Sequence, residues 1–209
     1  MINNQKSIFT QVKTSLLDPY NISIQDLDLM MSEMLSKGID MGDIYFQNIH
    51  QESWTLEDGL VKKSSYASRQ GVGFRSIVNE QSGLAYSESL EKDSLFKAAR
   101  ASSSIAKSGK TVTSKIEEPS SLQNYYSCVN PISSLEDKAK IELLQDIDSL
   151  ARSKDHRVKE VIASLAGNFQ NILIVNDLGR IVADIRPMVR LSLSAVSYTH
   201  LTLPTNREV

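Results

Sequence analysis

Apolar side chains recur every three or four positions between residues 24 and 37, which is the spacing of one face of a helix. The stripe consists of Leu27, Met30, Met31, Met34 and Leu35. Ser23, followed three residues later by Asp26, is typical of an N-terminal capping box, and Gly38 supplies a C-terminal stop. We predict a helix over 24–37 whose stripe packs into a core and is not a flexible, methionine-rich recognition face.

The period changes from 3.6 to 2 between residues 42 and 87, which is typical of strands. Asp58-Gly59 separates two extended runs and favours a type I′ hairpin turn, because both central residues of that turn need positive φ. A second turn is expected over 79–83. The pattern predicts an antiparallel meander of four short strands, at 53–57, 60–63, 71–78 and 84–87.

Helical spacing returns twice in the middle of the chain. One helix is expected over 90–108, and another over 134–154, where Ser133 and Glu136 form a capping box. Between them, residues 111–131 have no clear period and are interpreted as an exposed linker.

The last part of the chain is strand-like. Residues 176–179 are expected to form a turn, and Arg186-Pro187 indicates a bend or a sheet edge, because proline cannot donate a ladder hydrogen bond. The expected strands are 158–165, 169–175, 181–185 and 188–195. The order is helix, four strands, helix, linker, helix, four strands, so the predicted fold class is α+β, with antiparallel sheets covered by a few helices.

Composition narrows the class of protein. The 209 residues are 41% hydrophobic, which is enough for a folded core, and no apolar run approaches the length of a membrane span. The formal net charge of −2 argues against a nucleic-acid partner. The single cysteine, Cys128, excludes an intramolecular disulfide and favours a cytoplasmic protein.

The sequence contains no motif that would form an active site by itself. The three histidines are far apart, and His50 with Glu52 would give only two metal ligands on one strand face, so a surface histidine is the better interpretation. Gly71-Val72-Gly73 lacks the third glycine of a dinucleotide fingerprint and indicates a bulge or a close backbone approach. Cys128 is interpreted as a bystander thiol.

Six separated blocks nevertheless match a known family in order and spacing. They are residues 42–47 (GDIYFQ), 52–58 (ESWTLED), 70–75 (QGVGFR), 83–86 (GLAY), 157–161 (RVKEV) and 183–192 (ADIRPMVRLS). Over residues 14–195 the chain resembles the N-terminal domain of the TldD/PmbA family of bacterial zinc metalloproteases, and the TldD branch more than the PmbA branch.

The resemblance implies a cytoplasmic, heterodimeric peptidase that acts on unfolded proteins or peptides together with a PmbA/TldE-like partner subunit. In that family the zinc lies in the C-terminal domain, on a His-Glu-x-x-x-His helix and a later cysteine. This sequence contains no His-Glu dipeptide, so the resemblance assigns no catalytic, metal-binding or cofactor-binding role to any of its residues. We expect residues 1–195 to be a scaffold domain that binds no zinc and is inactive alone, with 196–209 a non-native, adapter-like tail.

Five residues are candidates for contacts with a substrate or a partner subunit: Trp54, Arg69, Arg75, Arg186 and Arg190. Arg69 and Arg75 also have a plain structural interpretation as surface or ion-paired side chains, and Trp54 as a core or interface anchor. Arg186 and Arg190 flank the last native strand, where a further domain would join, and are candidates for an interdomain contact. Two other functions stay open: a non-enzymatic module that binds peptides or docks a subunit by strand addition at a sheet edge, and a small enzyme with an unrecognised constellation.

Overall fold

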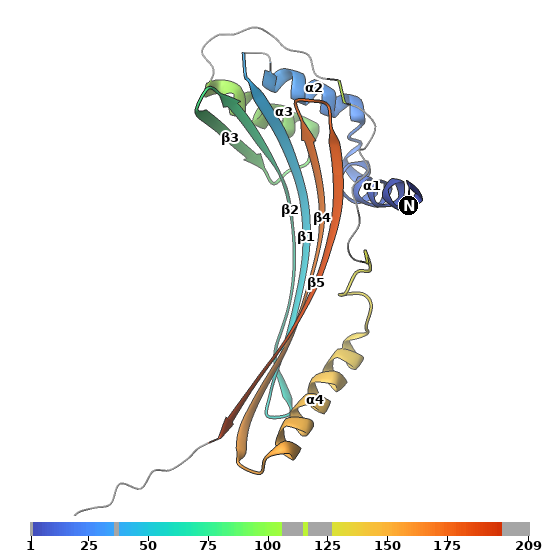
Figure 1. Cartoon of the computed structure of the whole chain (residues 1–209), viewed down its shortest axis with the longest axis vertical. Coiled ribbons are helices and arrows are strands. Elements are labelled where there is room, and N and C mark those ends of the chain that lie inside the picture. Colours follow the sequence, from blue (N-terminus) through green and yellow to red (C-terminus); the bar gives the residue numbers. More distant parts are fainter. Residues whose placement is uncertain (1, 36–37, 106–114, 117–126, 198–209) are drawn as a thin grey trace, which may run out of the picture. The chain divides into compact units, whose positions relative to one another are not determined.

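A computed structural model describes residues 2–35, 38–105, 115–116 and 127–197. Its centre is one five-stranded sheet with the strand order β3-β2-β1-β4-β5. The strands are β1 (Met41–Glu57), β2 (Leu60–Val78), β3 (Gln81–Ser87), β4 (Val158–Asn176) and β5 (Ile181–Ser197). The helices are α1 (Ile2–Leu16), α2 (Ile24–Leu35), α3 (Lys92–Ser102) and α4 (Asp137–Lys154), with short 3₁₀ turns at Asp18–Tyr20 and Ser103–Ile105. This is the predicted α+β class (Figure 1).

The sheet is antiparallel. β2 pairs with β3 from Val72 opposite Ser87 to Val78 opposite Gln81. Backbone hydrogen bonds join Asp58 to Val161 and Asp177 to Gly42, so β1 and β4 run in opposite directions. Asp58 and Gly59 have φ of 49° and 76°, as the predicted type I′ turn between β1 and β2 requires.

The chain forms two compact units, which we call unit 1 and unit 2. Unit 1 comprises Met1–Gln51, Ala67–Asn130 and Asn168–Met188, and unit 2 comprises Glu52–Tyr66, Pro131–Gly167 and Val189–Val209. The strands β1, β2, β4 and β5 contribute segments to both.

Unit 1 has the larger core. Its buried side chains come from α1, α2 and α3 and from one face of the sheet, where Ile44, Phe46 and Phe74 are at most 1% exposed. All five residues of the predicted stripe of α2 are buried, so the core interpretation of the methionines is confirmed. The capping box is confirmed as well: the Ser23 amide donates to Asp26 Oδ2 at 2.7 Å and the Asp26 amide donates to Ser23 Oγ at 3.1 Å.

Unit 2 is organised around α4. Its fully buried apolar cluster consists of Leu56 from β1, Leu144 from α4 and Ala163 from β4, with Trp54, Ile147 and Leu165 packed around it. Leu143 and Leu150 of α4 are 39% and 57% exposed.

The strands are longer and fewer than predicted. β1 and β2 each run without a break through polar stretches such as 48–53 and 64–69, and β5 continues through Pro187. Main-chain pairing with neighbouring strands holds such stretches extended, whatever their side chains. Because β5 lies at the edge of the sheet, the edge interpretation of Pro187 is confirmed.

The helix boundaries also differ. α1 was not predicted at all, and the expected capping box at Ser133 is wrong: α4 begins at Asp137, and the Ser134 hydroxyl instead donates to the carbonyl oxygen of Pro131 at 2.9 Å. α3 gives way to a 3₁₀ turn at Ser103, where the hydroxyls of Ser102, Ser103 and Ser104 bond back to carbonyl oxygens three residues earlier. Most of the expected linker 111–131, and residues 198–209 of the expected tail, lie outside the described residues.

Candidate functional site

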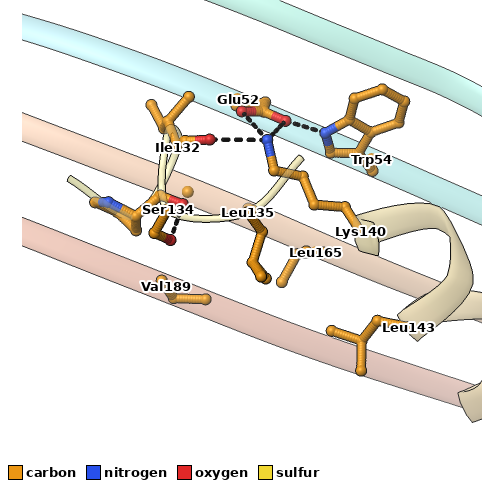
Figure 2. Close-up of a pocket in the computed structure, with 12 residues that line it drawn as sticks. Glu52, Trp54, Ile132, Ser134, Leu135, Lys140, Leu143, Leu165 and Val189 are labelled. Carbon is orange, nitrogen blue, oxygen red and sulfur yellow. Dashed lines mark hydrogen bonds and ion pairs between the residues drawn. The ribbon is translucent and has the colours of Figure 1, made fainter. Parts of the chain in front are cut away.

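A buried lysine is the most unusual feature of unit 2. Lys140, in the first turns of α4, has a side chain that is only 5% exposed. Its ammonium group donates to both carboxylate oxygens of Glu52, at 2.8 and 3.0 Å, and to the carbonyl oxygen of Ile132 at 2.8 Å. Asp137 adds a longer contact at 3.2 Å. Figure 2 shows the ammonium between Glu52 and Ile132.

The partner carboxylate is equally confined. The Glu52 side chain is 10% exposed, and the indole Nε1 of Trp54 donates a hydrogen bond to its Oε1. Glu52, Trp54 and Leu56 alternate along β1, so all three project from the face of the strand that α4 covers. We call Lys140, Glu52 and Trp54, with the Ile132 carbonyl, the lysine hub.

The hub keeps the lysine charged. Burial alone would lower the pKa of Lys140, but hydrogen bonds and charges from Glu52 and Asp137 outweigh it and raise that pKa above its ordinary value. A protonated ammonium with this many acceptors is neither a nucleophile nor a base. Its role is to fix the 131–137 segment and α4 against β1.

A hollow of about 140 Å³ lies beside the hub. Its walls are mainly apolar and include Leu135, Leu143, Leu165 and Val189 (Figure 2). A second hollow of about 420 Å³ shares Glu52, Trp54 and Lys140 with the first and adds polar residues from the start of β2, among them Ser64 and Tyr66.

The other end of α4 carries a second ionic contact. The guanidinium of Arg152 pairs with Asp148 one turn earlier, at 3.2 Å, and with Asp58 of the β1–β2 turn. It also donates to the carbonyl oxygen of Lys159 at 3.2 Å. We call this group the arginine clamp.

In unit 1, the sheet face opposite the helices carries three of the predicted contact residues. Val72, Phe74 and Ser76 of β2 are buried, so Arg69 and Arg75 project from the other face. Arg75 is paired with Asp43 at 2.7 Å, which agrees with its ion-paired interpretation, and Arg186 is paired with Asp184 at 2.6 Å. Arg69 is exposed and makes no ion pair within the described parts of the chain.

The same face is hollowed where β2 carries glycine. A hollow of about 340 Å³ is lined by Tyr45 and Gln47 of β1, Gly71 and Gly73 of β2, and Tyr86 at the end of β3. A Cβ at Gly71 would lie 3.2 Å from the Ser87 carbonyl oxygen, so the predicted close backbone approach is present there. At Gly73 a Cβ would meet no atom within 4 Å.

The remaining candidates are dispersed. Trp54 packs against the small core of unit 2, and Arg190 is exposed on β5 without an ion pair among the residues described. Cys128 is half-buried against the core of unit 1. Within the described ranges, no group of three or more His, Cys, Asp or Glu residues could hold a metal ion, so His50 and Glu52 gain no third ligand there.

The sequence contained a signal for the lysine hub that pattern reading missed. Lys140 precedes Leu144 by four residues and Ile147 by seven, so it lies on the apolar stripe of its own helix. Glu52 likewise stands in the apolar alternation of β1. Opposite charges on the buried faces of two elements indicate that those faces meet.

The fold is shared with solved structures. The chain superimposes with a TM-score of 0.63, at 19% identity, on a Thermotoga maritima protein solved as a candidate modulator of DNA gyrase, over 83% of this chain and 40% of that one. TldE from Thermococcus kodakarensis gives a TM-score of 0.61 at 18% identity, over 84% and 39%. The fold of this chain is therefore shared with a part of each of these larger proteins.

Sequence comparison assigns the family. Residues 42–106 match the model of PmbA/TldA metallopeptidase domain 1, and residues 130–200 match that of the central domain. The chain is 39% identical over 191 residues to the metalloprotease TldD homolog of Haemophilus influenzae, and 36% identical over 192 residues to that of Buchnera aphidicola. The chain belongs to the PmbA/TldD metallopeptidase family.

The matches cover about 90% of this chain but 40% of each relative, so the chain spans less than half the length of the curated relatives. Within the described residues, none of the helices is long and apolar enough to cross a membrane.

Proposed function

We propose that this chain is the N-terminal scaffold of a zinc-dependent metallopeptidase that acts on unfolded proteins or peptides in the cytoplasm. The observation that carries the proposal is the 39% identity to a metalloprotease TldD homolog over almost the whole of this chain. In this proposal the chain supplies walls for a substrate channel and a surface for a PmbA/TldE-like partner. Chemistry belongs to the remainder of the parent protein.

The residues described do not fit a zinc site of their own, as the dispersed histidines and carboxylates indicate. We therefore assign no catalytic step to them. The charged groups of the lysine hub and the arginine clamp form ion pairs within the chain, which is typical of residues with a structural role. Arg69 and Arg190 make no ion pair among the residues that the structure describes, and we propose that their charges bind a peptide or a partner subunit.

Metal analysis and a protease assay test the proposal directly. The 209-residue chain and the full-length parent, each purified with and without the partner subunit, are compared for zinc content and for cleavage of fluorescently labelled denatured casein. We expect zinc and chelator-sensitive cleavage only in preparations that contain the full-length parent. Stoichiometric zinc in the 209-residue chain, or metal-dependent cleavage by it, would overturn the proposal.

One observation favours the second function, strand addition by a peptide or subunit. β5 is an edge strand, and its Val189, Leu191 and Leu193 are 60%, 52% and 52% exposed. An apolar edge with free main-chain groups is a template for another strand. Replacing Leu191 with Lys should abolish peptide capture by the chain if this edge binds, whereas the scaffold function predicts no peptide capture by the chain alone.

A further inference from the structure

The hollow in unit 1 lies on the sheet face opposite the helices, which we call the open face. Its floor, at Gly71 and Gly73, has no side chains. β2 lies between β1 and β3 in the sheet, and Gly71 and Gly73 are consecutive residues of its open face. Side chains on the adjacent strands normally cover the space that a glycine leaves. Here Tyr86 stands directly opposite Gly73 in the register, yet it remains 81% exposed. The floor at Gly73 is therefore open.

Two tyrosines form the sides of the hollow. Tyr86 rises from β3, and Tyr45 rises from β1 on the other side of the glycines. Partial burial raises the pKa of Tyr45, and Arg186 and Asp184 act on it in opposite senses, so its phenol stays neutral at physiological pH. Aromatic side chains on both sides of a glycine floor suit a flat or bulky apolar side chain.

The hollow is lined by two charged side chains, Arg69 and Glu88, and both lie at its Gly71 end. Glu88 follows Ser87, the partner of Val72, and a Cβ on Gly71 would lie 3.9 Å from the Glu88 Cα. Arg69 lies on the same face of β2, two residues before Gly71. Neither Arg69 nor Glu88 makes an ion pair or a side-chain hydrogen bond among the described residues, whereas Arg75 and Arg186 are each neutralised by an aspartate.

We propose that this hollow binds a free α-amino acid with an aromatic or large aliphatic side chain. The α-carboxylate pairs with Arg69 and the α-ammonium with Glu88, because those two ligand groups are adjacent and need opposite charges side by side. The ligand side chain lies over Gly73 between Tyr45 and Tyr86. The proposal goes beyond the scaffold function, since it assigns to this chain a binding site for an end product of peptide hydrolysis.

Titration of the isotope-labelled 209-residue chain with L-phenylalanine, followed by amide NMR, tests the site. Saturable shifts are expected at Gly71, Gly73 and Tyr86. N-acetyl-phenylalanine and phenylalaninamide, which each lack one charge, should bind at least about tenfold more weakly, since each loses a charge-assisted hydrogen bond. No binding of phenylalanine at tens of millimolar, or equal binding of the blocked ligands, would overturn the proposal.

Variants locate the ligand. Arg69→Gln and Glu88→Gln should each lower the affinity for phenylalanine by a similar factor. The Arg69→Gln variant should bind phenylalaninamide as well as it binds phenylalanine, and the Glu88→Gln variant should bind N-acetyl-phenylalanine as well as it binds phenylalanine. Gly73→Val should fill the floor without a clash and abolish binding. Arg180→Gln, an exposed arginine outside the hollow, is the matched control. Should Gly73→Val fail to fold in a thermal melt, the two surface variants still decide the matter; unchanged affinity in both contradicts the site.

Discussion

Units 1 and 2 are stabilised in different ways. Among the described residues, the core of unit 1 gathers 24 buried apolar side chains, whereas that of unit 2 contains three. Unit 2 has instead the lysine hub near the start of α4 and the arginine clamp near its end. In unit 1, burial is the main contribution, to which the ion pairs Lys92–Asp26 and Arg100–Glu33 between α3 and α2 are added. In unit 2, one helix is fixed by charge.

The difference has an energetic consequence. Apolar burial contributes about 25 cal/mol per Å², while a buried ion pair gains Coulomb energy only after its desolvation has been offset. The lysine hub therefore specifies where α4 lies more than it stabilises the fold. We infer that α4 detaches at a lower free energy than the core of unit 1 opens.

The largest predicted effect is a core truncation in unit 1. Phe46→Ala should lower the free energy of unfolding by about 3–5 kcal/mol, because a fully buried ring leaves a cavity in a densely packed cluster. Leu144→Ala in unit 2 is the matched variant, and its cost should lie nearer to about 2 kcal/mol, since the small cluster can collapse around the gap. Urea denaturation measures both. An equal or larger loss for Leu144→Ala would remove the distinction between the units.

The lysine hub gives the next largest effect. Lys140→Met should destabilise the chain by about 3 kcal/mol, because Glu52 is left charged and buried. Adding Glu52→Leu should recover most of that loss, since the unpaired charge is then gone. A double-mutant cycle in urea measures the coupling. If the double variant is as unstable as the sum of the two single variants, the hub is not a coupled pair.

The smallest effect is an electrostatic one in unit 1. Burial alone would raise the pKa of Asp26, but hydrogen bonds from Lys92 and Ser23 lower it below the usual 3.8. The stabilisation is then fully present above the unfolded-state pKa and is lost as pH falls through the folded-state pKa. Asp26→Asn should cost about 1 kcal/mol at neutral pH and should flatten the fall of Tm between about pH 5 and pH 2.

A matched control accompanies that prediction. Asp146, exposed on α4, makes no ion pair among the described residues, so Asp146→Asn should leave the slope of Tm against pH unchanged. An equal reduction of the slope in both variants would show that the overall charge of the protein, and not the helix cap, determines how Tm falls at acid pH.

Sequence reasoning succeeded where the signal is local. The type I′ turn at Asp58-Gly59 and the cap of α2 at Ser23 depend on backbone angles and hydrogen bonds within a few residues, and both are present. It failed where distant partners decide. The length of β1 depends on main-chain pairing with β2 and β4, and the position of α4 against β1 depends on the contacts of Lys140 with Glu52 and Ile132.

The candidate site divides in the same way. A resemblance carried by six blocks gave the family, and the single-residue contacts it suggested remain proposals. The lysine hub needed two elements, 88 positions apart, to be brought together. Only the pairing of α4 with β1 shows that Lys140 and Glu52 neutralise each other. Likewise, only the structure shows that Arg75 and Arg186 are paired with aspartates, whereas Arg69 makes no ion pair in the described parts of the chain.

Native-state hydrogen exchange tests the central claim most directly. Amides of α4, such as those of Leu144 and Ile147, are compared with those of Ile44 and Phe46 in β1 at increasing low concentrations of urea. We predict that the α4 amides exchange through an opening that costs at least about 2 kcal/mol less than the opening that exposes Ile44 and Phe46. Identical opening free energies with identical urea dependence would show one cooperative unit and would contradict the account.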